Sequence, residues 1–153
     1  FQISVSNDRI MLDKFCEAFI KQDIQTIEKL FGDYLWHTIS IRDTAVAKVK
    51  QENFYHGILL GLFGYMADWV VKSNVESGIG YSDILIEIPE SRTGIVIELK
   101  YATDGNMDAA CLNALRQIDI KQYASKLKED GMCTIIKYGI ACYKKACKVC
   151  IGK

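Results

Sequence analysis

The chain has 153 residues, half of them hydrophobic and a quarter charged, which is typical of a folded domain and excludes a disordered polypeptide. Its 19 basic and 19 acidic residues cancel, so the overall charge does not recruit nucleic acid, and any phosphate binding must come from a local cluster. The longest uncharged run, residues 57–67, is too short to cross a bilayer, so we expect no membrane partner.

Two amphipathic helices are predicted near the N-terminus. Residues 9–22 carry apolar side chains at helical spacing, after a polar triplet that can cap the helix. Residues 24–37 repeat this pattern, with Asp23 as the candidate cap. We expect the pair to form an N-terminal helical extension, residues 1–42, that packs on a main domain of residues 43–153.

A longer helix is predicted over residues 43–71. Its middle is apolar on nearly every face, which indicates burial on several sides. Glu52 and His56 lie four residues apart and therefore share one face of this helix. We interpret His56 as a core histidine or as support for a site nearby. A strand is expected next, over residues 70–75.

A β-hairpin follows, built from YSDILIEI and TGIVIELKYA around the turn PESR. If the turn centres on Glu90 and Ser91, Asp83 stands directly opposite Glu98. Side chains alternate along each strand, so one face of the hairpin is a continuous aliphatic layer. The other face gathers Asp83, Glu98 and Lys100 at one end. A slip of one residue would bury these charges in the wrong layer, so the aliphatic face fixes the register.

The remaining segments complete an α/β pattern. A helix is predicted over residues 107–129, followed by strands within residues 133–145 and 147–151. From residue 43 onward the order is therefore helix, three strands, helix and two strands. This order predicts a central mixed sheet with helices packed on it.

The charged end of the hairpin has the composition of a metal site. Two carboxylates about 5 Å apart repel each other unless a cation neutralises them, and oxygen ligands suit Mg²⁺ or Mn²⁺. Asp83 and Glu98 are the candidate ligands, with the backbone carbonyl of Leu99 and the carboxylate of Glu52 as further candidates. Lys100 could orient or deprotonate a water, or offset charge in a transition state. Hydrolysis of a phosphodiester needs such a set.

At this point the sequence resembles a known family. GYSD, then IELK, then RQIDIKQYA look like the ordered motifs of the PD-(D/E)xK nuclease superfamily, and QENFYHGILLGL is similar to its first core helix. Ser82 stands in place of the name-giving proline and touches no candidate ligand. Over about residues 43–149 the chain resembles the branch found at the C-terminus of bacterial AAA-ATPase-like proteins, with YHG, SNVESGIGYSD and KYGIACYKK as the shared stretches.

The resemblance implies a restriction-endonuclease-like fold with an α-β-β-β-α-β core. It also implies cleavage of nucleic acid that depends on Mg²⁺ or Mn²⁺. We expect DNA as the substrate, with RNA as the open alternative. An ATPase module is expected upstream, in agreement with a sequence that begins at Phe1 without an initiator Met. A homodimer would suit cleavage of both strands of a duplex.

Carried over by position, the resemblance makes Asp83, Glu98 and Glu52 metal ligands and Lys100 the catalytic lysine. Gln117 matches the residue of the following helix that helps to organise the site.

Five residues are candidates for contact with nucleic acid. Tyr101 borders the site and could stack on a base. Lys121 and Tyr123 lie in the stretch that matches the following-helix motif, although Lys121 could equally be an ordinary exposed helix residue. Lys144 and Lys145 belong to a C-terminal segment, residues 131–153, that has five lysines and no acidic residue. Such lysines either face phosphates or protect an edge strand from aggregation.

Two other functions remain open. The first is a catalytically silent module that binds nucleic acid or regulates a larger ATPase. The second is an interaction domain tethered by zinc at Cys147 and Cys150, although a closed zinc site needs four ligands and no second CxxC is present. Because nothing at the N-terminus resembles a signal peptide, we expect a cytoplasmic protein with reduced cysteines.

Overall fold

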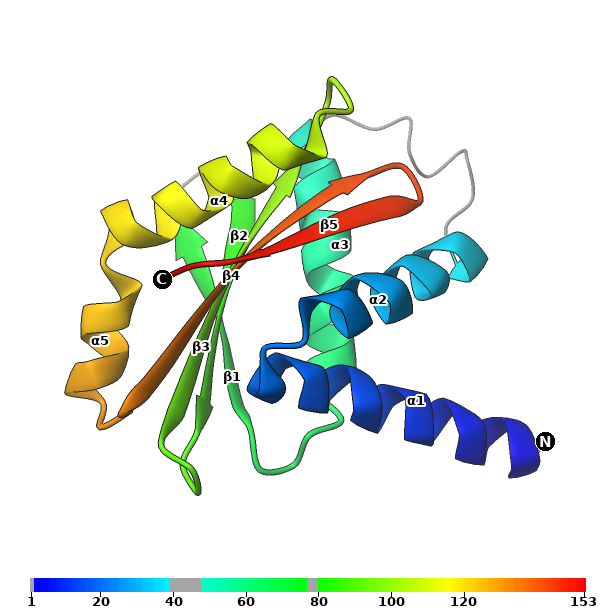
Figure 1. Ribbon diagram of the computed structural model, residues 1–153, viewed down its shortest axis with the longest axis horizontal. Coiled ribbons are helices and arrows are strands. Elements are labelled where there is room, and N and C mark those ends of the chain that lie inside the picture. Colours follow the sequence, from blue (N-terminus) through cyan, green and yellow to red (C-terminus); the bar gives the residue numbers. More distant parts are fainter. Residues whose placement is uncertain (1, 39–47, 77–79) are drawn as a thin grey trace.

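A five-stranded mixed sheet with helices on both faces organises the chain (Figure 1). The computed structural model describes residues 2–38, 48–76 and 80–153. Its elements, in chain order, are α1 (Gln2–Lys21), α2 (Ile24–Thr38), α3 (Lys48–Phe63), β1 (Val70–Glu76), β2 (Gly80–Ile88), β3 (Thr93–Tyr101), α4 (Met107–Lys121), α5 (Tyr123–Glu129), β4 (Thr134–Tyr143) and β5 (Ala146–Ile151). The predicted α/β class and the order of its core elements are confirmed. None of the helices described is long and apolar enough to span a membrane.

The strands lie in the sheet in their chain order, β1-β2-β3-β4-β5. β3 and β4 are parallel and every other neighbouring pair is antiparallel. A parallel pair needs a long crossover, and here α4 and α5 supply it. The β2–β3 register pairs Ile84 with Ile97 and Asp83 with Glu98, so the predicted register is confirmed.

The larger core lies on the face of the sheet covered by α1, α2 and α3. The aliphatic layer of β2 and β3 meets aromatic rings from the helices, and the ring centroids of Phe19 and Tyr138 are 5.1 Å apart. The Tyr138 hydroxyl donates a hydrogen bond of 2.6 Å to the Phe19 carbonyl, which ties α1 to β4. The N-terminal helices thus share one core with the sheet, and the division at residue 42 stays a proposal.

The opposite face carries the smaller core, made with α4 and α5. Leu85 and Val96 of the hairpin contact Ile118 of α4 and Leu127 of α5 in this layer. α4 comes very close to β4 at Gly139, where an added Cβ would lie 2.6 Å from the Cys111 carbonyl oxygen. Gly139 is the β4 partner of Glu98 in the sheet, so this close approach lies one strand away from the charged end of the hairpin.

Three predicted helix boundaries were wrong. The first helix begins at Gln2, so the polar triplet expected to cap it lies inside α1. The third helix ends at Phe63 rather than at residue 71, and its predicted start at residue 43 falls outside the described residues. The helix expected over residues 107–129 is broken at Gln122, whose φ of 57° is left-handed. The break separates α4, which crosses the strands, from α5, which packs along them.

Candidate active site

The hairpin brings two carboxylates together at the end of its ladder. The β2–β3 pairs run from Ile88–Thr93 to Asp83–Glu98, while β3 stays paired with β4 as far as Tyr101. Alternation along the strands places Asp83 and Glu98 on the face covered by α4 and α5. Both residues are 0% exposed. Fully buried carboxylates must be neutralised or protonated, because burial without a partner disfavours the charged form.

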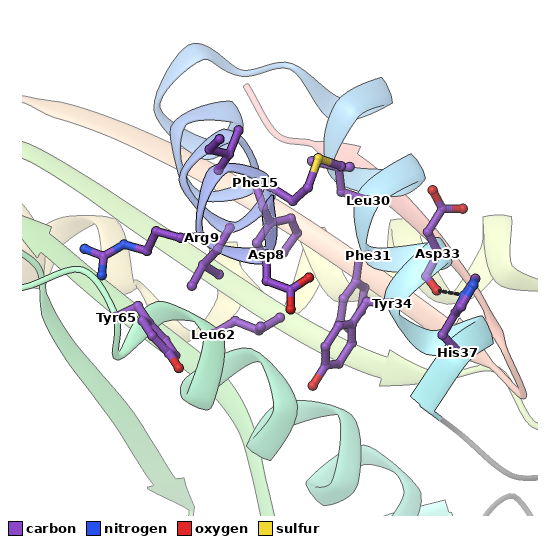
Figure 2. Close-up of a pocket in the computed structure, with 13 residues that line it drawn as sticks. Asp8, Arg9, Phe15, Leu30, Phe31, Asp33, Tyr34, His37, Leu62 and Tyr65 are labelled. Atoms are coloured by element: carbon purple, nitrogen blue, oxygen red, sulfur yellow. Dashed lines mark hydrogen bonds between the residues drawn. The ribbon is translucent and has the colours of Figure 1, made fainter. Parts of the chain in front are cut away.

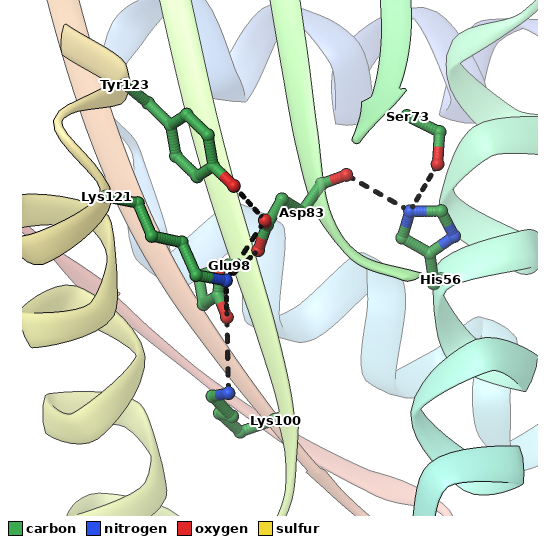
Figure 3. A network of polar contacts seen from close by, with 7 residues as sticks. All are labelled: His56, Ser73, Asp83, Glu98, Lys100, Lys121 and Tyr123. Atoms are coloured by element: carbon green, nitrogen blue, oxygen red, sulfur yellow. Dashed lines mark hydrogen bonds and ion pairs between the residues drawn. The ribbon is translucent and has the colours of Figure 1, made fainter. Parts of the chain in front are cut away.

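Two lysines supply the neutralising charge (Figure 3). The Lys100 Nζ lies 3.2 Å from Oε1 of Glu98, as expected for residues two apart on one strand. The Lys121 Nζ lies 3.3 and 3.2 Å from Oδ1 and Oδ2 of Asp83 and 3.5 Å from Oε1 of Glu98. The cluster therefore holds two acids and two bases in contact, which is the condition for keeping charges in a low-dielectric interior.

Tyr123 fixes the orientation of the Asp83 carboxylate. Its hydroxyl donates a hydrogen bond to Oδ2 of Asp83, and its ring is buried in the smaller core. Lys121 is the last residue of α4 and Tyr123 the first of α5, with the left-handed Gln122 between them. The break in the helix is therefore what lets these two neighbouring side chains converge on one carboxylate.

His56 holds the backbone of Asp83 from the other face of the sheet (Figure 3). Its Nε2 lies 3.2 Å from the Asp83 carbonyl oxygen and 3.2 Å from the Ser73 hydroxyl oxygen. A carbonyl accepts but cannot donate, so Nε2 carries the hydrogen. Burial lowers the pKa of His56 below its ordinary value, which favours the neutral ring. His56 is thus a buried support for the site, as the sequence had suggested.

The whole arrangement agrees with a comparison of the sequence with family models. Residues 50–151 match the model described as the PD-(D/E)XK nuclease superfamily, which covers about two thirds of the chain. The chain belongs to the PD-(D/E)XK nuclease superfamily. Comparisons with curated proteins and with solved structures gave no match. Membership indicates a nuclease whose substrate is nucleic acid, and it agrees with the restriction-endonuclease-like arrangement of the sheet and helices.

The donor set fits the divalent ion that the superfamily implies. Asp83 and Glu98 offer carboxylate oxygens from adjacent strands on one face, and oxygen is the ligand that Mg²⁺ and Mn²⁺ prefer. Around them, the described part of the chain has no group of three or more acidic, His or Cys side chains that could hold a metal ion. We refer to Asp83 and Glu98 together as the acidic centre.

Glu52, a residue of α3, contacts the end of β3 and does not belong to that centre. Its Oε1 accepts a hydrogen bond of 3.2 Å from the backbone N–H of Tyr101. This contact ties α3 to the strand one residue beyond Lys100. Its role as a further ligand of a PD-(D/E)XK metal site stays a proposal.

Three other predicted residues surround the centre without contacting it directly. The Leu99 side chain is fully buried in the larger core, so its carbonyl is what it could offer to a metal. The Tyr101 ring is 8% exposed and stacks on Tyr55 with centroids 6.0 Å apart, which leaves little of the ring free to meet a base. Gln117 is partly exposed on α4, one turn before Lys121.

Lys144 and Lys145 occupy the β4–β5 turn, beyond the end of β3. The Lys144 Nζ lies 5.2 Å from the centroid of the Tyr143 ring, and the Lys145 Nζ lies 5.1 Å from that of Trp36. Cys142 is the β4 partner of Tyr101, so the turn shares the end of the sheet to which Lys100 belongs. Two lysines held over aromatic rings form a local basic patch in a chain without net charge.

The CxxC sequence does not form a chelating pair. Cys147 pairs with Cys142 and Cys150 pairs with Gly139, so residues three apart in β5 point to opposite faces. Burial also raises the pKa of the Cys147 thiol to about 12, away from the thiolate that zinc requires. This geometry argues against a zinc-tethered domain.

One cavity lies away from the acidic centre. It has a volume of about 1130 Å³ and lies between α1, α2 and the end of α3, with Phe15, Phe31 and Leu62 among its lining residues (Figure 2). Its lining is mainly apolar and includes neither Asp83 nor Glu98. The cavity is therefore separate from the two carboxylates on which the predicted chemistry depends.

Sequence reasoning missed two of these contacts. Ser73 gave no signal, because a lone serine in a strand is unremarkable. Lys121 was expected at a nucleic-acid surface, but it lies against both carboxylates. The available signal was the stripe of Ala110, Ala114 and Gln117 leading to it, since small residues on a helix indicate close packing.

Proposed function

We propose that this chain is a nuclease that hydrolyses phosphodiester bonds of DNA with Mg²⁺ or Mn²⁺ held by Asp83 and Glu98. The observation that supports it most is the opposition of these two buried carboxylates across adjacent strands, with Lys100 in contact with one of them. A carboxylate pair is a costly feature in a protein interior, and a fold retains one where it binds a cation or performs chemistry.

A divalent ion at this pair would polarise the scissile phosphate and lower the pKa of a water. The residues of the chain have separate tasks. Lys100 presents an ammonium group beside the pair, where it can orient the attacking water and stabilise negative charge on the phosphate. Tyr123 and His56 hold the side chain and the backbone of Asp83 from two sides, so the ligand is preorganised.

Further residues complete the proposal around this centre. We assign Lys144 and Lys145 to the phosphate backbone of the substrate, because they form a basic patch at the adjacent end of the sheet. Glu52, the Leu99 carbonyl and Gln117 remain candidates that would extend the metal site.

The cellular setting is proposed on separate grounds. The stretches YHG, SNVESGIGYSD and KYGIACYKK favour an ATPase module joined to this domain, and cleavage of a duplex would favour a homodimer. All six cysteines are free thiols, and three of them are buried, which fits a reducing cytoplasm.

The experiment is a cleavage assay on labelled DNA and RNA, single- and double-stranded, with Mg²⁺, Mn²⁺ or EDTA. Asp83→Ala and Lys100→Ala should each lower the rate by about 10² to 10⁴, because each removes a group that acts on the transition state. Glu129→Ala and Lys128→Ala are the matched controls, since both residues are exposed on α5, and they should cut like the parent. Cutting that survives both site substitutions would reject the site.

A second candidate is a silent nucleic-acid-binding module. It is favoured by one observation, that Lys121 and Lys100 already neutralise the pair. In that case calorimetry would detect no Mn²⁺ binding, and DNA binding would be unchanged by EDTA. Metal binding that is lost in Asp83→Ala would exclude this candidate.

A further inference from the structure

We propose that Lys121 is the resident cation of the acidic centre, and that a divalent ion binds by displacing its ammonium group. This inference rests on the proposed function, because it takes Asp83 and Glu98 as the ligands. It assigns Lys121 a role in controlling metal entry, rather than a role at a nucleic-acid surface.

The position of the ammonium group is the first argument. Lys100 contacts Glu98, whereas Lys121 contacts both acids and lies within 3.2 to 3.5 Å of oxygens from each. A cation that bridges two ligands stands where a shared metal ion would stand. In the metal-free protein Lys121 thus neutralises the two carboxylates, as a divalent ion would in the metal-bound protein.

The two cations exclude each other. Mg²⁺ requires its ligand oxygens at 2.0 to 2.1 Å in a near-octahedral arrangement. Three of the four carboxylate oxygens of Asp83 and Glu98, namely both of Asp83 and Oε1 of Glu98, already contact the Lys121 ammonium group. An ammonium group left in place would also repel the incoming ion across a site with little solvent to screen it. Binding therefore requires the lysine to leave.

The Lys121 side chain is placed so that it can leave the acidic centre. This side chain is 15% exposed, whereas those of Asp83 and Glu98 are 1% and 0% exposed, so Lys121 reaches solvent, as does Lys100 at 19%. Lys121 stands at the last position of α4, next to the left-handed Gln122. A four-carbon stem at a helix end can swing outward without unfolding the helix.

The consequence is measurable as a change in metal affinity. The contacts of Lys121 with Asp83 and Glu98 must break before a metal ion binds, and losing them opposes binding. Lys121→Met keeps the stem and removes the ammonium, so it should bind Mn²⁺ about tenfold or more tightly than the parent chain. Without metal the same variant should melt at a lower temperature, because the contacts of Lys121 with two buried carboxylates are lost.

The test is isothermal titration calorimetry with Mn²⁺ and with Mg²⁺, alongside thermal unfolding in EDTA and in Mn²⁺. Lys128→Met is the matched control, since it removes the same charge from an exposed position of α5 and should leave the affinity unchanged. Asp83→Asn is the site control and should bind more weakly. Lys121→Gln serves as a second variant, because it removes the charge but can still donate a hydrogen bond to the carboxylates.

The outcomes separate the two claims. If Lys121→Met and Lys121→Gln bind Mn²⁺ no more tightly than the parent, while Asp83→Asn binds more weakly, Lys121 is not the resident cation and the metal site stands. If none of these chains binds metal, the proposed function fails and this inference fails with it. If a Lys121 variant folds only with Mn²⁺, or binds metal where the parent does not, the displacement is supported.

Discussion

The two faces of the β2–β3 hairpin come from the same strands and meet opposite requirements. One face packs Ile84 and Ile97 into the larger core with the helices α1, α2 and α3. The other face, one residue away along each strand, buries Asp83 and Glu98 under α4 and α5. The two carboxylates cannot determine the strand register, because buried like charges repel each other. Packing of the apolar face determines the register, and this register places Asp83 opposite Glu98.

The two faces also differ in what burial contributes. Each aliphatic side chain in the larger core gains free energy from leaving water, at about 25 cal/mol for each Å² of apolar surface. Each charge in the acidic centre loses its hydration on burial. The contacts with Lys100 and Lys121 offset this loss of free energy. The first face therefore holds the fold, and the second face is available for binding and chemistry. Four predictions test that contrast.

The largest stability effect is expected on the apolar face. Ile97→Ala removes a side chain with no exposed surface and should cost about 2 to 5 kcal/mol of unfolding free energy, because a cavity remains where the chain cannot collapse. Urea unfolding in EDTA measures it. Ile120→Ala is the control, since Ile120 is 72% exposed on α4 and should change stability by less than about 0.5 kcal/mol. Equal losses in the two variants would contradict the assignment of the core.

The next effect concerns the charged face. Asp83→Asn and Lys121→Met should each cost about 3 kcal/mol without metal, near the low end for breaking a buried ion pair, because Lys121 is partly exposed. The double variant should cost less than the sum of the two, since it leaves no lone partner behind. A double-mutant cycle by urea unfolding measures the coupling, which we expect at about 0.5 to 3 kcal/mol. Strict additivity would mean that the two residues do not stabilise each other.

A smaller effect tests how α4 is held over that face. Gly139→Ala would place a Cβ 2.6 Å from the Cys111 carbonyl oxygen, so α4 must move away from the sheet. We expect a loss of about 1 to 3 kcal/mol of unfolding free energy, measured by urea unfolding, because the packing of α4 on β4 is disturbed. Gly57→Ala is the matched control. Nothing lies within 4 Å of its added Cβ, and in a helix it should gain about 0.5 to 1 kcal/mol.

The part of the fold that could be predicted is the part that local patterns determine. Alternation of Ile, Leu and Val fixed the hairpin register, and with it the facing of Asp83 and Glu98 and the position of Lys100. The helical periodicity of residues 24–37 likewise gave α2 to within one residue at its C-terminal end. In both cases the pattern repeats along one element, so the neighbouring elements are not needed to interpret it.

The parts that could not be predicted depend on contacts between elements. The break at Gln122 follows no Gly or Pro, and RQIDIKQYA is compatible with one continuous helix. Packing against the sheet determines where the helix breaks, because Ile118 of α4 and Leu127 of α5 both contact the hairpin. The contact of Lys121 with Asp83 depends on the same packing, which no local pattern contains.

The smallest stability effect is expected at Asp23, the exposed residue that caps α2. Asp23 accepts hydrogen bonds from the Thr26 N–H at 3.2 Å and from the Thr26 hydroxyl at 2.6 Å, just before α2. These bonds lower the pKa of Asp23 below its ordinary value. A carboxyl with a lowered folded pKa adds stability that is complete above its unfolded pKa, near 3.8, and is lost as the pH falls through the folded value.

Asp23→Ala should therefore be less stable than the parent at pH 6, and this gap should narrow as the pH falls toward 3. The measurement is the urea midpoint of both chains across that range. Asp23→Asn can accept the same bonds without ionising, so its urea midpoint should stay closer to the parent's than that of Asp23→Ala at pH 6. A gap that does not depend on pH would show that the cap acts through its geometry and not through its charge.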